Sequence, residues 1–189
     1  MWPHSPFRRA GHLRHIRIVN GHPDPDASRF CAALARAYLE GVRSAEGHAE
    51  AFTLASMGER DWERACSAHR GEWRLVAVFP LWLDKAPAPM TRFVSRMQGC
   101  AGAECIVTMD LPGLMARTSG ASLGFGPLPI ERTTVIGSVG SLSPVQRERR
   151  LERVRMLGAQ AAMPGRPQRI RPRCQTAGLA PSWAEPAPA

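Results

Sequence analysis

Short continuous runs of apolar residues alternate along this chain with longer stretches in which apolar residues recur at helical spacing. The continuous runs predict strands at residues 15–20, 75–79, 105–109 and 133–137, and a weaker strand at 49–54. The helically spaced stretches predict helices from Ser28 or Arg29 to about residue 42, at 62–69, at 90–97 and at 145–162. A Gly-, Ser- and Pro-rich stretch at 110–129 predicts a long loop.

This alternation of strands and helices predicts an α/β fold with a parallel sheet covered by helices on both faces. The run 75–79 is apolar throughout, as expected for a central strand that is covered on both sides. In such sheets ligands bind beyond the carboxyl ends of the strands, where the strand order reverses. The loops that follow the first, third and fourth strands are therefore the candidate functional segments.

Capping residues and prolines predict where the helices begin. Asp26 or Ser28 is expected to cap the first helix, because a short side-chain oxygen accepts from the free amides of the first turn. Ser143 and Pro144 are expected as the N-cap and first-turn proline of the last helix. Pro89 is expected to interrupt the start of the helix after the third strand, because proline lacks a backbone donor.

The chain of 189 residues suits one domain, which we place at residues 15–162. We interpret residues 1–14 as a flexible leader and residues 163–189, rich in Pro, Arg and Ala, as a disordered basic tail. The sequence has no signal-peptide core and no apolar run of membrane-spanning length, so we expect no membrane insertion. The five scattered cysteines lack metal-binding spacing and suit a reducing compartment, so we expect a cytoplasmic protein without a bound metal.

The formal net charge is +9, and much of it lies near the C-terminus. Between residues 147 and 173 the sequence has nine arginines against two glutamates. The favoured interpretation is a solvated helix face followed by a basic tail. The alternative is a patch that attracts the phosphates of a nucleic acid, a membrane or a nucleotide. No nucleic-acid-binding motif accompanies these arginines, so we expect no nucleic-acid partner.

The loop after the first strand, GHPDPDASRF, leads directly into a helix. A helix amino terminus offers unpaired amides and the positive end of the helix dipole, which suit a phosphate monoester. Ser28 adds a hydroxyl donor and Arg29 a positive charge, whereas Asp24 and Asp26 oppose a phosphate unless they point away. From these residues alone, an ordinary capped turn explains the loop as well as a phosphate site does.

The other two loops place an aromatic and a polar residue at the same edge of the predicted sheet. Trp82 follows the third strand, where it is badly placed for the core and well placed to lie against a flat aromatic ligand. Alternatively, Trp82 packs beneath its own loop. Thr108 lies in the fourth strand near its end, and its hydroxyl and the amides that follow can complete a third side of a pocket.

Three segments together resemble the flavodoxin-like NAD(P)H dehydrogenases (quinone). They are HIRIVNGHPDPDASRFCAALARAYLEG, LVAVFPLWLDKAPAPMTRFVSRM and CIVTMDLPG, and the ending ERTTVIGSV before a basic helix also resembles that family. The resemblance covers about residues 15–160. It implies a flavodoxin-like, doubly wound, five-stranded parallel sheet of order 2-1-3-4-5 and a bound FMN or FAD, and the shortened loops favour FMN slightly.

Carried over residue by residue, the resemblance implies a flavin site built from the three loops. The flavin phosphate would be held by His22, Ser28, Phe30 and Cys31. The isoalloxazine ring would be contacted by Pro80, Leu81, Trp82, Leu83, Thr108, Met109 and Asp110. Hydride would pass from NAD(P)H to the flavin and then to a quinone or similar acceptor, without a catalytic side chain, because the flavin carries the chemistry. Relatives often form dimers, so a homodimer is a further expectation.

The chain departs from this family mainly where the substrate would bind. Asp84 stands where the family usually has glycine, near the flavin, where an acid disfavours the anionic reduced ring. The segments from Met97 to Cys105 and from Met115 to Gly126 are shorter than usual, and in relatives they help to build the nicotinamide and quinone site. The alternative hypothesis is therefore a shortened relative that binds flavin or a partner with little or no turnover.

Overall fold

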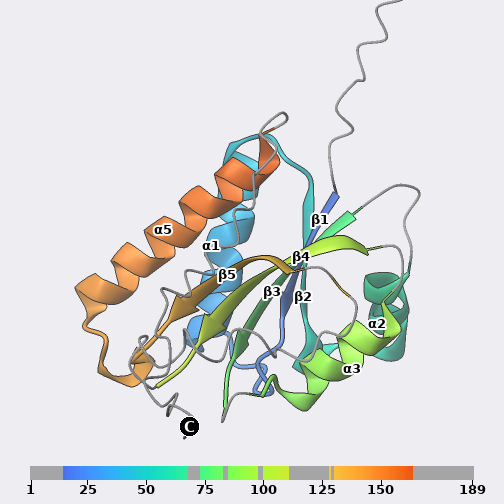
Figure 1. The fold of residues 1–189 in the computed structure, drawn as a ribbon, viewed down its shortest axis with the longest axis horizontal. Helices are drawn as coiled ribbons and strands as arrows, with labels where there is room; N and C mark the ends of the chain where they lie inside the picture. The colour runs from blue at the N-terminus through green and yellow to red at the C-terminus, as the bar shows by residue number, and fades with distance from the viewer. Residues whose placement is uncertain are drawn as a thin grey trace, which may run out of the picture.

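The structure is a computed structural model that describes residues 15–67, 73–82, 85–97, 100–110, 128 and 130–163. These residues form one sheet of five parallel strands: β1 (His15–Asn20), β2 (Ala49–Thr53), β3 (Trp73–Pro80), β4 (Cys100–Thr108) and β5 (Ile130–Ile136). The strand order β2-β1-β3-β4-β5 confirms the prediction (Figure 1). The predicted leader, and the predicted tail after Met163, lie outside the described residues.

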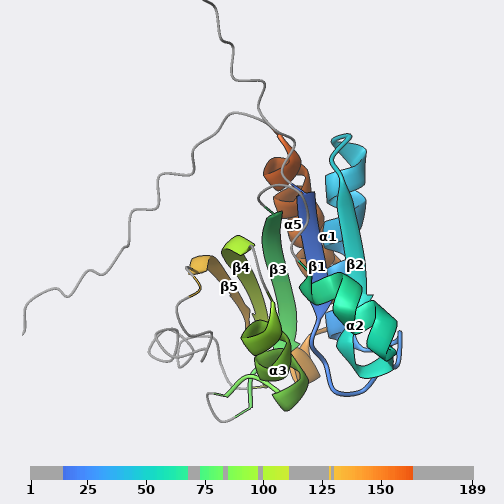
Figure 2. The ribbon, with the colours of Figure 1, turned by 90° about the vertical axis from the view of Figure 1, so that its right-hand side faces the viewer.

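Helices cover both faces of the sheet. α1 (Phe30–Ser44) and α5 (Pro144–Ala162) lie side by side on one face, and α2 (Glu59–Cys66) and α3 (Ala88–Arg96) lie on the other (Figures 1 and 2). Two short 3-10 helices, η1 (Leu54–Ser56) and η2 (Val139–Ser141), follow β2 and β5. None of the helices in the described part of the chain is long and apolar enough to span a lipid bilayer.

The alternation of side chains along the strands divides the core into two layers. Ile16 and Ile18 of β1 pack with residues of α1 and α5, whereas Val19 packs with residues of α2 and α3. The central strand β3 contributes to both layers and is buried along its whole length except at Arg74. Burial on both faces is the reason that this strand is a continuous apolar run in the sequence.

The prolines of α3 and α5 both occupy the first turn of their helix. Ser143 caps α5 and accepts from the amide of Gln146, whose side chain accepts in return from the amide of Ser143, so the predicted start at Pro144 is confirmed. Pro89 is the second residue of α3. The prediction that it interrupts this helix is wrong, because amides of the first turn have no intrahelical acceptor.

The helix α1 begins later than predicted. Its first residue is Phe30 and its N-cap residue is Arg29, and no side chain in the described part of the chain caps it. The carboxylate of Asp26 instead accepts from the amide of Ser28 within the preceding loop (2.8 Å). The prediction that Asp26 or Ser28 caps α1 is therefore wrong, because the loop uses Asp26 for a turn of its own.

Both β4 and β5 begin earlier than predicted, because polar residues pair across them. β4 begins at Cys100 rather than at residue 105, and β5 begins at Ile130 rather than at residue 133. The added residues include Glu104 and Arg132, which form a salt bridge between the two strands (2.6 Å). A pattern of apolar residues cannot reveal strand segments whose side chains are buried through their pairing with one another.

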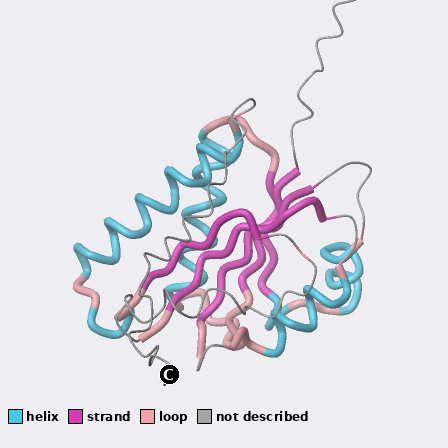
Figure 3. The backbone as a smooth tube through the Cα atoms, viewed as in Figure 1, coloured by secondary structure: helices cyan, strands magenta, loops and turns pink. Residues whose placement is uncertain are grey.

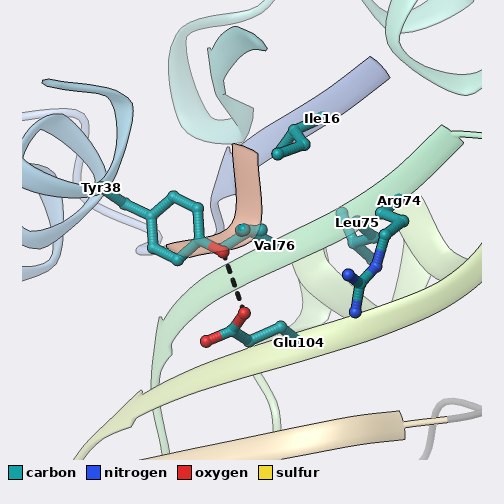
Figure 4. Close-up of a pocket in the computed structure, with 7 residues that line it drawn as sticks. Ile16, Tyr38, Arg74, Leu75, Val76 and Glu104 are labelled. Atoms are coloured by element: carbon teal, nitrogen blue, oxygen red, sulfur yellow. Dashed lines mark hydrogen bonds between the residues drawn. The ribbon is translucent and has the colours of Figure 1, made fainter. Parts of the chain in front are cut away.

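The carboxylate of Glu104 joins α1 to the edge of the sheet. Glu104 is 4% exposed and accepts from the hydroxyl of Tyr38 (2.9 Å) and from the guanidinium of Arg132 (2.6 and 2.8 Å). Figure 4 shows Tyr38 pointing from α1 toward Glu104. Burial raises the pKa of Tyr38 well above its usual range, and the nearby Glu104 raises it further.

At the crossing of α1 and α5, the two helices approach so closely that two glycines are required. A Cβ atom on Gly41 would lie 1.9 Å from the carbonyl oxygen of Arg155, and a Cβ on Gly158 would lie 2.2 Å from that of Tyr38. Both contacts are with backbone atoms, which cannot rotate away as a flexible side chain can. The crossing therefore sets the separation of the two helices.

A buried arginine holds the end of α2 against the sheet. Arg17 of β1 is fully buried, donates to the carbonyls of Ala65 and Ser67 (both 2.8 Å) and lies 4.4 Å from the ring centroid of Trp73. Carbonyls at the end of a helix lack intrahelical donors, so Arg17 pairs groups that the helix itself leaves unpaired. Burial lowers the pKa of Arg17, and the carboxylate of Glu50 on β2 opposes this effect.

Gly158→Ala is expected to lower the free energy of unfolding by about 2 kcal/mol or more, because its methyl group has no space against the backbone of α1. Urea denaturation followed by circular dichroism measures the change. Gly58→Ala is the matched control: nothing lies within 4 Å of a Cβ at Gly58, so a loss below about 1 kcal/mol is expected. Equal losses in the two variants would contradict the role of the crossing.

Tyr38 is the single tyrosine of the chain, so the absorbance of tyrosinate reports its ionisation alone. We expect the native protein to titrate well above pH 10 and the urea-denatured chain to titrate near pH 10. Because the folded-state pKa is raised, the contribution of Tyr38 to stability is present below about pH 10 and is lost as the pH rises toward the folded-state pKa. A native titration near pH 10 would show that the hydroxyl is not buried. The variant Tyr38→Phe is the control, because it should show no tyrosinate absorbance.

Candidate functional site

The carboxyl ends of neighbouring parallel strands lie at one edge of the sheet, where their loops gather (Figure 3). Backbone hydrogen bonds continue beyond the strand ends, from the amide of Gly21 to Val78 (2.8 Å), of Leu81 to Thr108 (2.8 Å) and of Met109 to Ile136 (3.0 Å). The loops after β1, β3 and β4 are therefore held beside one another as direct extensions of their strands.

The first loop, residues 21–29, is folded by hydrogen bonds among its own residues and the end of β1. The buried side chain of Asn20 accepts from the amide of His22 (3.1 Å), and the ring Nδ1 of His22 accepts from the amide of Asp24 (3.0 Å). The carboxylate of Asp24 accepts from the amide of Asp26 (2.9 Å) and from the guanidinium of Arg29 (2.5 Å). This network defines the shape of the loop.

The two loop carboxylates are paired with donors of the loop itself. The amide of Asp26, and after it the side chain of Arg29, lowers the pKa of Asp24, and hydrogen bonds from Ser28 lower the pKa of Asp26. Both acids are therefore ionised at neutral pH, and Asp24 balances the positive charge of Arg29. Attraction for a phosphate at this loop would have to come from the amides of α1 rather than from Arg29.

Two features at the amino end of α1 bear on anion binding: the amides of its first turn and a nearby arginine side chain. Its first-turn amides receive no side-chain cap from the described residues, which leaves them available to an acceptor. Phe30, the first residue of the helix, is partly buried, and the guanidinium of Arg147 on α5 lies 5.5 Å from the centroid of its ring. The sequence analysis missed Arg147, which it counted within a solvated helix face. Its position near the start of α5 could have identified it, because α5, like α1, begins at the carboxyl end of a strand.

Trp82 stands beyond the end of β3 with 54% of its surface exposed, so its predicted place outside the core is confirmed. Its backbone forms two hydrogen bonds with that of Lys85 (3.0 and 3.2 Å). The ring of His22 meets the indole edge-on, with centroids 6.3 Å apart and planes at 75°. The structure thus brings the first and second candidate loops together. Leu83 and Asp84 lie outside the described residues.

Below the loops, Cys31 of α1 meets Thr108 of β4. The Sγ of Cys31 and the Oγ1 of Thr108 are 3.3 Å apart, and both side chains are buried. Burial raises the pKa of the Cys31 thiol to about 11, and the hydrogen bond with Thr108 opposes only part of this effect. Cys31 packs in the core on the α1 side, so we expect its thiol to react slowly even though it lies at a helix amino end.

The remaining predicted ring contacts lie within the sheet edge or beside it. Pro80 ends β3, and Leu81 and Met109 are each 7% exposed and belong to the core beneath α2 and α3. Asp110 is exposed, and its carboxylate accepts from the amide of Gly140 in η2 (3.0 Å). The side chains of Leu81 and Met109 thus pack in the core under the carboxyl ends of the strands. Contact of a ligand with Pro80, Leu81, Met109 or Asp110 stays a prediction.

Neither a protein-family model nor a curated protein matches this sequence, whereas solved structures match its fold. An NAD(P)H:quinone oxidoreductase from Methanothermobacter marburgensis matches with a TM-score of 0.57 and 17% identity, over 80% of this chain and 98% of that chain. An FMN-dependent NADH-azoreductase from Bacillus anthracis str. Ames Ancestor, in complex with FMN, matches with a TM-score of 0.54 and 11% identity, over 80% and 100%. The apo form of an NADH:FMN oxidoreductase (EMOB) matches with a TM-score of 0.53 and 13% identity, over 82% and 92%.

These similarities, together with the order of the five parallel strands, show that the chain has a flavodoxin-like fold. The resemblance inferred from the three sequence motifs is confirmed at the level of the fold. The strand order reverses between β1 and β3, and His22 and Trp82 meet in the loops that follow these two strands. In open α/β sheets, ligands bind outside the strand ends at such a point.

Cys66 is expected to react with iodoacetamide faster than Cys31 and Cys105 in the native protein near pH 8. Burial raises the pKa of Cys31 to about 11 and that of Cys105 to about 12, so their thiolate fractions fall roughly a hundredfold or more below that of an ordinary thiol. Cys66 is only partly buried. Peptide mass mapping over a time course measures the three rates, which should converge in urea. Fast native alkylation of Cys31 would contradict its burial against Thr108.

Proposed function

We propose that this protein is a flavin-dependent NAD(P)H oxidoreductase, which passes hydride from NAD(P)H through a bound flavin to a quinone or a similar acceptor. The observation that carries the proposal is the exposed Trp82 against His22, at the same sheet edge as the uncapped amino end of α1. This combination suits a flat aromatic ligand that carries a phosphate group, and a flavin nucleotide is such a ligand.

The residues around the start of α1 fit the phosphate half of this ligand. The first-turn amides would donate to the phosphate, with support from the positive end of the helix dipole. Ser28 is exposed immediately before the helix and would add its hydroxyl, and His22 would flank the group. Cys31 would contribute through its backbone amide, because its thiol is held by Thr108. Arg29 is paired with Asp24, so Arg147, which lies beside Phe30, would supply the positive charge at the phosphate instead.

The ends of β3 and β4 fit the ring half. The indole of Trp82 would lie against the isoalloxazine, and the exposed fraction of this side chain leaves room for that contact. Pro80, Leu81, Leu83, Thr108, Met109 and Asp110 are the other predicted ring contacts. The bound flavin would supply the hydride chemistry, and the protein would supply orientation and electrostatics.

The comparisons support FMN over FAD as the cofactor, because two of the similar proteins are named for FMN and none of those described above is named for FAD. A quinone acceptor is supported by the similarity to an NAD(P)H:quinone oxidoreductase. The homodimer stays a prediction from the sequence, which leaves open whether NADH or NADPH is the co-substrate.

The full chain, mixed with excess FMN and passed through gel filtration, is expected to retain flavin absorbance and to oxidise NADH or NADPH with a soluble quinone as acceptor. A protein that stays colourless and does not oxidise either nucleotide would refute the proposal. Retained flavin without turnover would instead favour the shortened relative that binds flavin and does not catalyse. Mass spectrometry of the cofactor released from protein purified without added flavin distinguishes FMN from FAD.

Trp82→Ala is expected to weaken FMN binding about tenfold, because one aromatic stacking contact contributes about 1–3 kcal/mol. Quenching of flavin fluorescence measures the affinity. Since Trp82 is more than half exposed, thermal stability should change little. Val145→Ala, an exposed apolar position on α5, is the matched control and should bind FMN as the unmodified chain does. Equal affinity in both variants would place the ring away from Trp82.

A further inference from the structure

A groove runs between the edge strand β5 and the helix α5, on the face of the sheet that α1 and α5 cover. Its volume is about 540 Å³. Ile136, Val154 and Leu157 contribute apolar side chains to its lining, and Arg150 and Arg153 line it from the helix. Arg132, Thr133 and Thr134 line it from β5, so the groove combines apolar, hydroxyl and basic side chains.

The strand β5 forms the outer edge of the described sheet. It pairs with β4 on one side, and none of the described strands pairs with it on the other. The outer side of an edge strand presents unpaired amides and carbonyls, which can accept an additional strand. The residues 133–136 are Thr, Thr, Val and Ile, which are all β-branched and favour an extended backbone.

Two of the arginines in the groove carry charges that the described residues do not neutralise. Arg132 is paired with Glu104, and Arg155 elsewhere on α5 is paired with Glu40. Arg150 and Arg153, by contrast, have no carboxylate within 4.0 Å among the residues that the structure describes. The groove thus offers two positive charges to an acidic ligand beside a strand edge.

The rest of this chain does not supply such a ligand. Residues 1–14 and 111–129 contain no acidic residue, and residues 164–189 contain one glutamate against four arginines. A second copy that paired its own β5 here would bring the same arginines toward one another, and like charges in contact oppose association. Charge complementarity therefore points to a different protein with acidic side chains.

We propose that β5 and this groove form a docking site for an extended acidic segment of a partner protein. The segment would add to β5 as a further strand and would pair with the backbone groups on the side of β5 that no other described strand occupies. Because alternate residues of a strand point to the same face, acidic side chains at every second position would lie over Arg150 and Arg153. The intervening side chains would point to the opposite face of the sheet.

A fluorescent peptide of alternating valine and glutamate, as long as the 7 residues of β5, tests this site by anisotropy with the full chain. We expect binding that weakens strongly near 1 M salt, where exposed charges are screened. The variant Arg150→Glu with Arg153→Glu should bind at least about tenfold more weakly, as expected when attractive charges become repulsive. Arg60→Glu with Arg149→Glu is the matched control, because it makes the same change of charge at exposed helical positions outside the groove and should leave binding unchanged.

Two further measurements distinguish strand addition by a partner from other ways of occupying the groove. The same peptide with N-methyl groups on alternate backbone amides should lose binding, because it cannot complete the ladder; unchanged binding would refute strand addition. Failure of the unmodified peptide to bind, or equal binding to both double variants, would refute the site. Sedimentation velocity completes the test: a dimer that dissociates only in the variant Arg150→Glu with Arg153→Glu would assign this face to a second copy and overturn the proposal.

Discussion

The backbone contact between α1 and α5 is the constraint on which the rest of the structure depends. Gly41 and Gly158 allow the two helices to touch without intervening side chains, and this sets how α5 lies over the sheet. Both helices begin at the carboxyl edge of the strands, so their crossing also determines where Arg147 stands relative to the start of α1. The same placement of α5 leaves the groove beside β5. One close contact thus governs both the flavin site and the docking site that we propose.

Buried charges complete this framework where apolar packing ends. Glu104 links Tyr38 of α1 to Arg132 of β5, and Arg17 links β1 to the last carbonyls of α2. A buried charge is costly unless its partners are in place, so these groups favour one arrangement of helix and strand over others. They fix α1 against β4 and β5, and α2 against β1.

In the loops at the carboxyl edge of the sheet, hydrogen bonds and burial change the roles that the residue types alone suggest. Arg29 looked like a phosphate ligand, yet Asp24 holds its guanidinium, and Cys31 at a helix amino end has a raised thiol pKa because it is buried against Thr108. Trp82 keeps its predicted place outside the core, because it follows the end of β3 by two residues and its side chain is more than half exposed. The site therefore depends on the backbone of α1 and on one exposed indole more than on charged side chains of the first loop.

The sequence by itself determined the parallel α/β architecture, the strands β1 and β3, and the capped start of α5, because continuous apolar runs and a local capping box are signals contained in neighbouring residues. The first halves of β4 and β5 escaped it, since Glu104 is buried there through its pairing with the partly buried Arg132, which lies far from it in the chain. Only the tertiary structure decided that Arg147 stands near Phe30, that His22 meets Trp82, and that Arg150 and Arg153 line a groove beside the edge strand of the described sheet. Each of these contacts joins segments whose separation is set by helix crossing and sheet order, which no local pattern of residues encodes.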